Sequence, residues 1–323
     1  MRKYLYFTVF ISGMITLAVE MTAERLLGSV FGASNLVWAS IIGLILLYLA
    51  AGYYLGGFLA DRYPSYRVFY QILIWAAILI TVSTVISRPV LRFASQAFDQ
   101  LQLGPLFGSF AVVLLLFALP ITLMGTAAPF AIRLAVHDNR SIGSTFGRVY
   151  AISTCGSFIG VFLPVLVLIP PIGTYRTLIV LSAMLLITAL YGLGLTSGWR
   201  ASLPYAWAPL LLAFLFWQGL PGADRAARGM IFETESSYNY IQVLEQDGFR
   251  LLRLNEGQGV HSVYHPQQLV YQGPWEQALA APFFNPAPFD PTRVQRMAIV
   301  GLAAGTTARQ ATAVFGPIPI DGY

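Results

Sequence analysis

The sequence predicts an α-helical membrane bundle of about seven transmembrane helices, followed by a small antiparallel β-sheet and the beginning of a Rossmann-like α/β domain. Hydrophobic residues make up 57% of the 323 residues and charged residues only 10%, against about 25% charged in an ordinary soluble domain. The long apolar runs lie almost entirely before Pro221, whereas the remainder has the composition of a soluble protein. We therefore predict a bundle at 1–220, a small sheet at 221–284 and the start of an α/β core at 285–323.

Composition and charge also exclude several classes of site. The single cysteine, Cys155, rules out an intrachain disulfide and gives no basis for a cysteine-based metal site. The net charge of +5 is spread over loops, without a Lys/Arg run interleaved with aromatics. This distribution indicates loop charge beside a lipid bilayer and no nucleic-acid partner. The apolar run after Lys3 is longer than a signal-peptide core, so we predict a retained first span.

Seven segments of the bundle have, or approach, the length of a membrane-crossing helix, which is about 20 apolar residues. The fourth contains Pro120 and Pro129 and is expected to be kinked or to end early, and the seventh is barely long enough. The predicted segments lie near residues 5–27, 35–60, 67–88, 106–134, 147–170, 176–197 and 204–220.

Glu20 and Glu24 are ionisable residues of the first segment, and they share a helix face because they are four positions apart. Charged groups at membrane depth are costly, which makes them candidates for a functional site. The alternative is that Glu24 and Arg25 lie near the headgroups and that a neighbouring helix satisfies Glu20. In either case we expect Glu20 to face other helices, with Ser40 or Ser153 as polar partners.

Pairs of glycines four residues apart predict close contacts between helices. Gly52 and Gly56 form one such pair, and Gly156 and Gly160 form another, for which we favour a packing role over a substrate contact. The loop at residues 57–67 resembles the loop between the second and third helices of major facilitator transporters, with a proline in place of the usual second glycine.

The soluble part begins with alternating residues of the kind that form strands. The segments 240–245 and 249–254 flank Asp247-Gly248, which is a hairpin turn signal. Farther on, 297–300 is a short apolar run that suits a buried strand, and 301–305 is a small-residue turn before a helix. Such a turn can present backbone N–H groups to a nucleotide-type ligand, although small residues also serve plain strand-to-helix packing.

The soluble part contains four blocks in sequence: Glu235–Val243, Leu254–Gly257 with His261-Ser262, Tyr271–Trp275 and Gly301–Gln310. Their order and spacing resemble the opening of a spermidine synthase. More closely, the whole chain resembles bacterial proteins in which a multi-span membrane region is fused to a spermidine-synthase-like domain. The resemblance implies transfer of an aminopropyl group from decarboxylated S-adenosylmethionine, as cosubstrate, to a polyamine such as putrescine. It also implies a multi-pass protein of the bacterial inner membrane with a cytoplasmic soluble domain.

The resemblance assigns ligand-binding positions to residues of both the sheet and the glycine turn. A Tyr-Gln pair of the family aligns with Tyr238 and Asn239, where Asn keeps the amide but shortens its reach. A second family Gln is replaced by His261, and the acid that helps to hold the donor is replaced by Ala304. The six positions are Tyr238, Asn239, His261, Gly301, Ala304 and Gly305.

The resemblance places further functional residues beyond Tyr323. These are the acid that would hold the ribose hydroxyls and the aspartate that draws the proton from the attacking amine, so we name no catalytic residue and expect no turnover by this chain. With part of the core expected beyond Tyr323, residues 285–323 are expected to be poorly ordered or prone to aggregation. Asp321 is interpreted as a turn residue, and Trp275 as a core residue.

Two other functions stay open beside aminopropyl transfer. One is a membrane transporter or sensor with a domain that binds an adenosyl compound or a polyamine, and the other is an S-adenosylmethionine-dependent methyltransferase. A homo-oligomer is also left open.

Basic residues divide eight to five in favour of an amino end inside the cell, which with seven spans puts the soluble part outside. A re-entrant 204–220 segment, a miscounted span or a misleading charge bias would each resolve that conflict.

Overall fold

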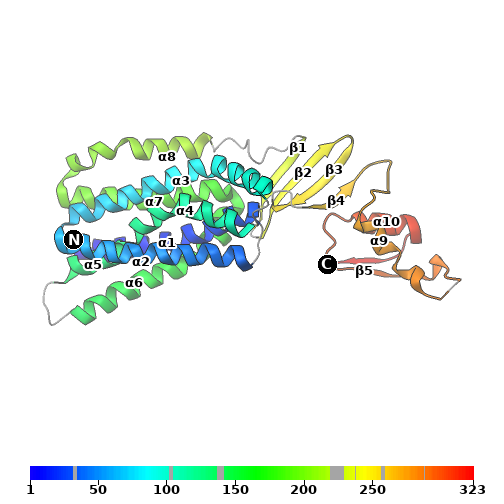
Figure 1. The fold of residues 1–323 in the computed structure, drawn as a ribbon, viewed down its shortest axis with the longest axis horizontal. Helices are drawn as coiled ribbons and strands as arrows, with labels where there is room; N and C mark the ends of the chain where they lie inside the picture. Colours follow the sequence, from blue (N-terminus) through cyan, green and yellow to red (C-terminus); the bar gives the residue numbers. More distant parts are fainter. Residues whose placement is uncertain are drawn as a thin grey trace. The chain divides into compact units, whose positions relative to one another are not determined.

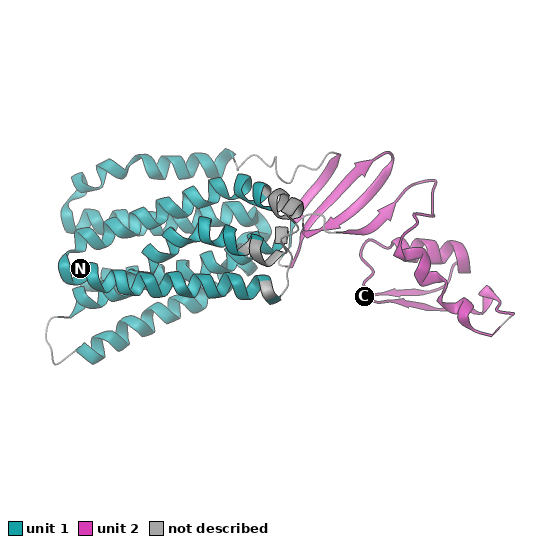
Figure 2. Cartoon of the chain, in the orientation of Figure 1, with its two compact units in different colours: residues 1–224, 235–237 teal, residues 225–234, 238–323 magenta. Residues whose placement is uncertain are grey.

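The structure, a computed structural model, describes residues 1–31, 35–101, 105–136, 142–218, 229–236, 238–255, 259–286 and 288–323. The chain divides into two compact units, which Figure 1 and Figure 2 show. Unit 1 comprises residues 1–224 together with 235–237, and unit 2 comprises residues 225–234 together with 238–323. The predicted domain boundary at residue 220 lies outside the described residues.

Unit 1 is a bundle of apolar helices with one continuous hydrophobic core. The described residues form helices α1 (Arg2–Phe31), α2 (Asn35–Arg62), α3 (Tyr66–Leu101), α4 (Pro105–Gly125), α5 (Ala127–Ala135), α6 (Ile142–Phe162), α7 (Ile169–Ser197) and α8 (Trp207–Gln218).

Five helical stretches of the described residues are long and apolar enough to cross a membrane, which is compatible with a membrane-spanning protein. The fifth, Ile142–Ser197, is 56 residues long and contains both the predicted 147–170 and 176–197 segments. The predicted 204–220 segment contains α8, whose 12 residues span about 18 Å, less than the roughly 30 Å of a bilayer core.

The regular α-helix is interrupted in two of the predicted apolar segments, 106–134 and 147–170, in each case near prolines or glycines. The segment predicted at 106–134 is interrupted at Thr126, between α4 and α5. It does not end early, because Thr126 keeps helical dihedral angles (φ −66°, ψ −20°) and the apolar stretch continues to Ala135. Gly56 of α2 packs against this break, since an added Cβ would lie 2.6 Å from the Cα of Thr126. Between α6 and α7 a π-helical turn, Leu163–Leu168, precedes Gly173, whose φ of 78° interrupts the helix.

The amino-terminal helix α1 packs most extensively on α6 and α7. At Gly156 and Gly160 of α6, an added Cβ would collide with backbone atoms of Phe10 and Met14 in α1. The prediction that these glycines serve close packing is therefore confirmed. Glu20 is 6% exposed, so it faces the protein interior as predicted.

Unit 2 begins with a four-stranded sheet in the order β1-β2-β3-β4. Its central pairs, β2–β3 and β3–β4, are antiparallel. The predicted hairpin turn is confirmed, because Asp247 and Gly248 both have positive φ (52° and 82°). The strands are β1 (Met230–Glu235), β2 (Tyr240–Gln246), β3 (Phe249–Leu254) and β4 (Val260–Tyr264).

A β–α–β unit completes unit 2: β5 (Met297–Ile299), α10 (Thr306–Phe315) and β6 (Ile320–Gly322). The strands β5 and β6 pair in parallel. A small core of Leu279, Ala311 and Phe315 joins α10 to α9 (Pro274–Leu279), with Met297 and Ile320 packed against it. Short 3₁₀ turns, Ala281–Phe284 and Pro291–Arg293, link α9 to β5.

Candidate functional site

The candidate site is built around the turn between β5 and α10. Gly301, Ala303 and Gly305 have positive φ values of 86°, 49° and 82°. Glycine adopts this left-handed conformation without the steric cost that a side chain adds, which explains two of the three residues. The turn then leads directly into α10, which starts at Thr306 with no side-chain cap on its first N–H groups.

Most amides of this turn are hydrogen-bonded within the chain. The N–H groups of Gly301 and Leu302 donate to the carbonyl oxygen of Tyr323 at 2.8 and 3.0 Å, and Gly305 N–H donates to the Leu302 oxygen at 2.9 Å. Ala304 N–H donates to the hydroxyl of Ser262 at 2.9 Å. A ligand at the turn would therefore meet the N–H of Ala303 and the uncapped first turn of α10, which carries partial positive charge.

Two hydroxyl groups attach β4 to this turn. Ser262 and Thr306 are both 4% exposed. The Thr306 hydroxyl accepts from the N–H of Val263 at 2.8 Å and donates to its carbonyl at 2.9 Å. Sequence reasoning did not single out Ser262 or Thr306 as site residues, although the resemblance blocks contain both.

His261 precedes Ser262, which contacts Ala304. The pairing of β3 with β4 shifts register here, since Leu252 pairs with Ser262 and Arg253 with Val260, which leaves His261 without a pairing partner in β3. The His261 ring is exposed, with Nδ1 3.2 Å from the carbonyl oxygen of Gly259.

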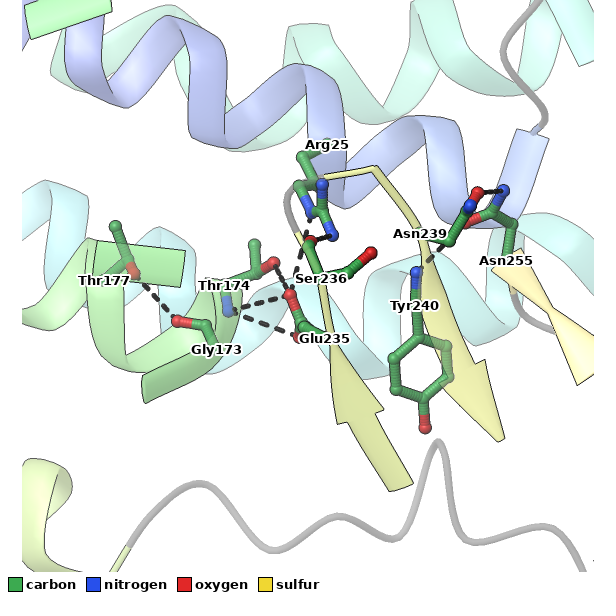
Figure 3. Close-up of polar contacts among 9 residues, drawn as sticks. All are labelled: Arg25, Gly173, Thr174, Thr177, Glu235, Ser236, Asn239, Tyr240 and Asn255. Atoms are coloured by element: carbon green, nitrogen blue, oxygen red, sulfur yellow. Dashed lines mark hydrogen bonds and ion pairs between the residues drawn. The ribbon is translucent and has the colours of Figure 1, made fainter. Parts of the chain in front are cut away.

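Tyr238 and Asn239 lie directly before β2, and His261 lies in β4. Because β3 separates these two strands, β2 and β4 are about 10 Å apart at the usual strand spacing. The side-chain oxygen of Asn239 accepts from the Asn255 amide at 2.9 Å, and Asn255 in turn accepts from the N–H of Tyr240 at 3.2 Å (Figure 3). Tyr238 is 88% exposed. The structure therefore joins Ala304 to β4 but does not gather all six predicted positions around one point.

Glu276 at the start of α9 organises the segment next to α10. Its carboxylate accepts from the N–H groups of Tyr271 and Gly273, the latter at 2.9 Å, and from the Gln310 amide at 2.7 Å. Burial raises the pKa of the Glu276 carboxyl, but these donors together outweigh that effect and hold its pKa below the usual 4.5. The carboxylate is thus charged at neutral pH and fixes the loop that precedes α9.

A separate polar cluster lies within unit 1 (Figure 3). The Glu235 carboxylate accepts from the N–H of Thr174 at 3.2 Å and from its hydroxyl at 2.6 Å. Arg25 lies 3.7 Å from the same carboxylate and donates to the carbonyl of Ser236. Because Gly173 interrupts α7, Glu235 supplies an anion to the start of the helix that follows.

Within the described ranges, no group of three His, Cys, Asp or Glu side chains is arranged to hold a metal ion. No protein-family model matches the chain, and no curated protein and no solved structure matches it significantly.

Proposed function

We propose that this protein is a membrane-anchored aminopropyltransferase of the spermidine synthase type. In this reaction the amine of a polyamine such as putrescine attacks the aminopropyl carbon of decarboxylated S-adenosylmethionine. A carbon–nitrogen bond forms, the carbon–sulfur bond breaks, and methylthioadenosine leaves with the electron pair of that bond. The main contributions expected from such a site are positioning of the two substrates and removal of the amine proton.

The observation that carries this proposal is the parallel β5–α10–β6 unit that follows an antiparallel sheet. A strand, a glycine turn and a helix amino end are the parts with which a Rossmann-like core binds a nucleotide-type ligand. We infer that unit 2 contains the beginning of such a core. The hydroxyl contacts of Ser262 and Thr306 support it, because they hold the small sheet beside the turn.

Direct binding measurements on the full chain in detergent test this proposal. We expect calorimetric titration to detect decarboxylated S-adenosylmethionine and methylthioadenosine. Gly301→Val and Gly305→Val should each weaken binding at least tenfold, because a side chain there occupies the space over the turn. A Cβ at either position meets no atom within 4 Å in the protein itself.

Gly316→Val is the matched control for these two variants. Gly316 has a φ of 87° and equally open surroundings, but it lies at the opposite end of α10. A side chain at Gly316 is strained at least as much as one at Gly305, because Gly316 has a ψ of −174° and Gly305 has the left-handed ψ of 22°. Such a side chain does not block the turn. Unchanged affinity in the Gly301 and Gly305 variants, or an equal loss in the Gly316 variant, would place the ligand elsewhere.

We also propose that unit 2 is cytoplasmic and that the bundle crosses a bacterial inner membrane seven times, with the short helix α8 as the seventh crossing. The amino end would then lie outside the cytoplasm, against the eight-to-five division of basic residues. The 56 residues of Ile142–Ser197 would measure about 84 Å as one straight helix, enough for two crossings separated near Gly173. Tyr4 donates to the carbonyl of Thr188 at 2.6 Å, whereas Phe216 near the end of α8 contacts Arg176 at the other end of α7. The amino end of the chain therefore lies beside the carboxyl-terminal end of α7, and the end of α8 lies beside the amino-terminal part of α7. This arrangement supports opposite sides of the membrane for these two ends. Reporter fusions at Met1 and Tyr323 should therefore report opposite sides, and a shared side would refute seven crossings.

A transporter of polyamines is the second candidate, and burial of Glu20 favours it. A carboxyl group that is 6% exposed inside α1 offers a counter-charge for an organic cation in the bundle. If this function is correct, proteoliposomes should take up labelled putrescine and Glu20→Gln should abolish the uptake. Uptake that is absent, or equal in Glu20→Gln, would exclude it.

A further inference from the structure

A groove of about 370 Å³ lies between α7 and α8 in unit 1. Its lining is apolar throughout, and on α7 it extends from Ile179 to Ile187, a length of about 12 Å along the helix axis. The side chains that line it include Ile179, Ala183 and Ile187 of α7 and Pro209, Leu212 and Phe216 of α8.

One end of this groove carries a positive charge. Arg176 lies one turn before Ile179 on α7, and its guanidinium stands over the ring of Phe216 at 5.9 Å. The Arg176 side chain is exposed, and among the described residues no carboxylate pairs with it.

An aromatic residue at the same end indicates the depth of Arg176 in the bilayer. Trp217 follows Phe216 on α8 and is 82% exposed. Exposed Trp side chains are enriched where the hydrocarbon layer meets the headgroups. Arg176 would then lie at the level of lipid phosphates, with the apolar groove extending from it toward the hydrocarbon layer.

We propose that this groove is a binding site for an anionic phospholipid, with one acyl chain between α7 and α8 and the phosphate on Arg176. The groove belongs to helices that the bilayer surrounds, so acyl chains are the apolar molecules available to fill it. A guanidinium binds phosphate oxygens through charge-assisted hydrogen bonds, and basic pockets between membrane helices bind anionic headgroups in this way. The site is independent of the ligand proposed for unit 2.

Lipid titration of the full chain, purified and delipidated in a neutral detergent, tests the proposal. Native mass spectrometry should detect one tightly retained phosphatidylglycerol, with weaker retention of phosphatidylcholine. Arg176→Gln should weaken phosphatidylglycerol binding roughly fivefold, the effect expected of one basic side chain near an anionic lipid. Arg67→Gln, which removes an exposed arginine at the start of α3 outside the groove, is the control and should have no effect.

Filling the groove tests the acyl chain separately. Ala183→Phe on α7 and Ala213→Leu on α8 should each reduce binding of both lipids, since both alanines line the groove. Using two variants guards against one that fails to fold, and circular dichroism identifies such a case. The proposal is overturned if either folded variant binds phosphatidylglycerol like the wild type, or if Arg176→Gln behaves like Arg67→Gln. Competition by inorganic phosphate at the same concentration as the lipid would also overturn it, by showing a site for free phosphate.

Discussion

Gly156 and Gly160 allow the backbones of α6 and α1 to touch. Any side chain at Gly156 would overlap the carbonyl of Phe10, and one at Gly160 would overlap that of Met14. In a membrane, where lipid tails are as apolar as leucine, helices associate largely through such close packing.

At the same scale, the charge of Glu276 holds the N–H groups of the loop before α9.

We predict that Gly156→Ala lowers the stability of the bundle by about 1–3 kcal/mol, the usual cost of overpacking. Thermal unfolding in detergent, followed by tryptophan fluorescence, measures this change. Gly147→Ala is the control on the same helix, because an added Cβ there meets no atom within 4 Å. It should be neutral or stabilising by up to about 1 kcal/mol, as expected for Ala in place of Gly in a helix. Equal effects of the two substitutions would contradict the packing role.

The pH dependence of the loop before α9 should follow the ionisation of Glu276. Its folded pKa lies below the usual 4.5, so the charged form contributes stability above that pH. The contribution is lost as pH falls through the lowered pKa. Hydrogen exchange should show faster exchange of the Tyr271 and Gly273 amides in Glu276→Gln than in the wild type at pH 7. A difference that stays constant as the pH is lowered until Glu276 is protonated would argue against an electrostatic origin.

At the scale of elements, the unpredicted feature is how α10 is attached to the rest of unit 2. Arg309 donates to the carbonyls of His265 and Pro266 at 2.6 and 3.2 Å and to the Tyr271 hydroxyl at 3.1 Å. Its guanidinium also stacks over Tyr264 at 4.6 Å. Arg309 therefore holds the start of the connection between β4 and α9, while Gln310 and Glu276 hold its later part.

We predict that Arg309→Lys loosens this connection, because lysine cannot reproduce the planar fork and the stacking. Losing hydrogen bonds worth about 1 kcal/mol each should raise the rate of chymotrypsin cleavage between 264 and 271 roughly tenfold. Arg296→Lys is the control, since Arg296 pairs with Asp321 at the exposed edge of β5 and β6. Cleavage at the wild-type rate in Arg309→Lys would show that other contacts hold the loop.

For the molecule as a whole, the important feature is that the two units have separate and unequal cores. The bundle buries apolar side chains from all its long helices. In the described part of unit 2, α10 and α9 share a small core in which Leu279, Ala311 and Phe315 are buried and a few partly buried side chains pack against them. Val300, at the end of β5, is 90% exposed. A small core with exposed apolar residues beside it predicts that this part of unit 2 opens before the bundle does.

We predict that Phe315→Ala removes exchange protection from α10 without changing the unfolding temperature of the bundle. Truncating a buried Phe typically costs about 3–5 kcal/mol, which is comparable to the stability of a small domain. Leu185→Ala, at a fully buried position of α7, is the reciprocal control. It should lower the unfolding temperature of the bundle and leave the exchange of α10 unchanged. A shared response to both variants would show that the units unfold together.

The sequence by itself determined the features that depend on local pattern. Apolar runs of membrane-crossing length predicted the helices, the Asp247-Gly248 pair predicted a hairpin, and the small residues 301–305 predicted a turn before a helix. The tertiary structure alone decided which distant groups meet. Examples are the Ser262 and Thr306 hydroxyls on the turn, and the Glu235 carboxylate at the start of the helix after Gly173. The periodicity of a sequence indicates the face of an element on which a side chain lies. It does not indicate what that face contacts, because the contacting residues are more than 40 positions away in the sequence. Such distant segments meet only when the hydrophobic cores form.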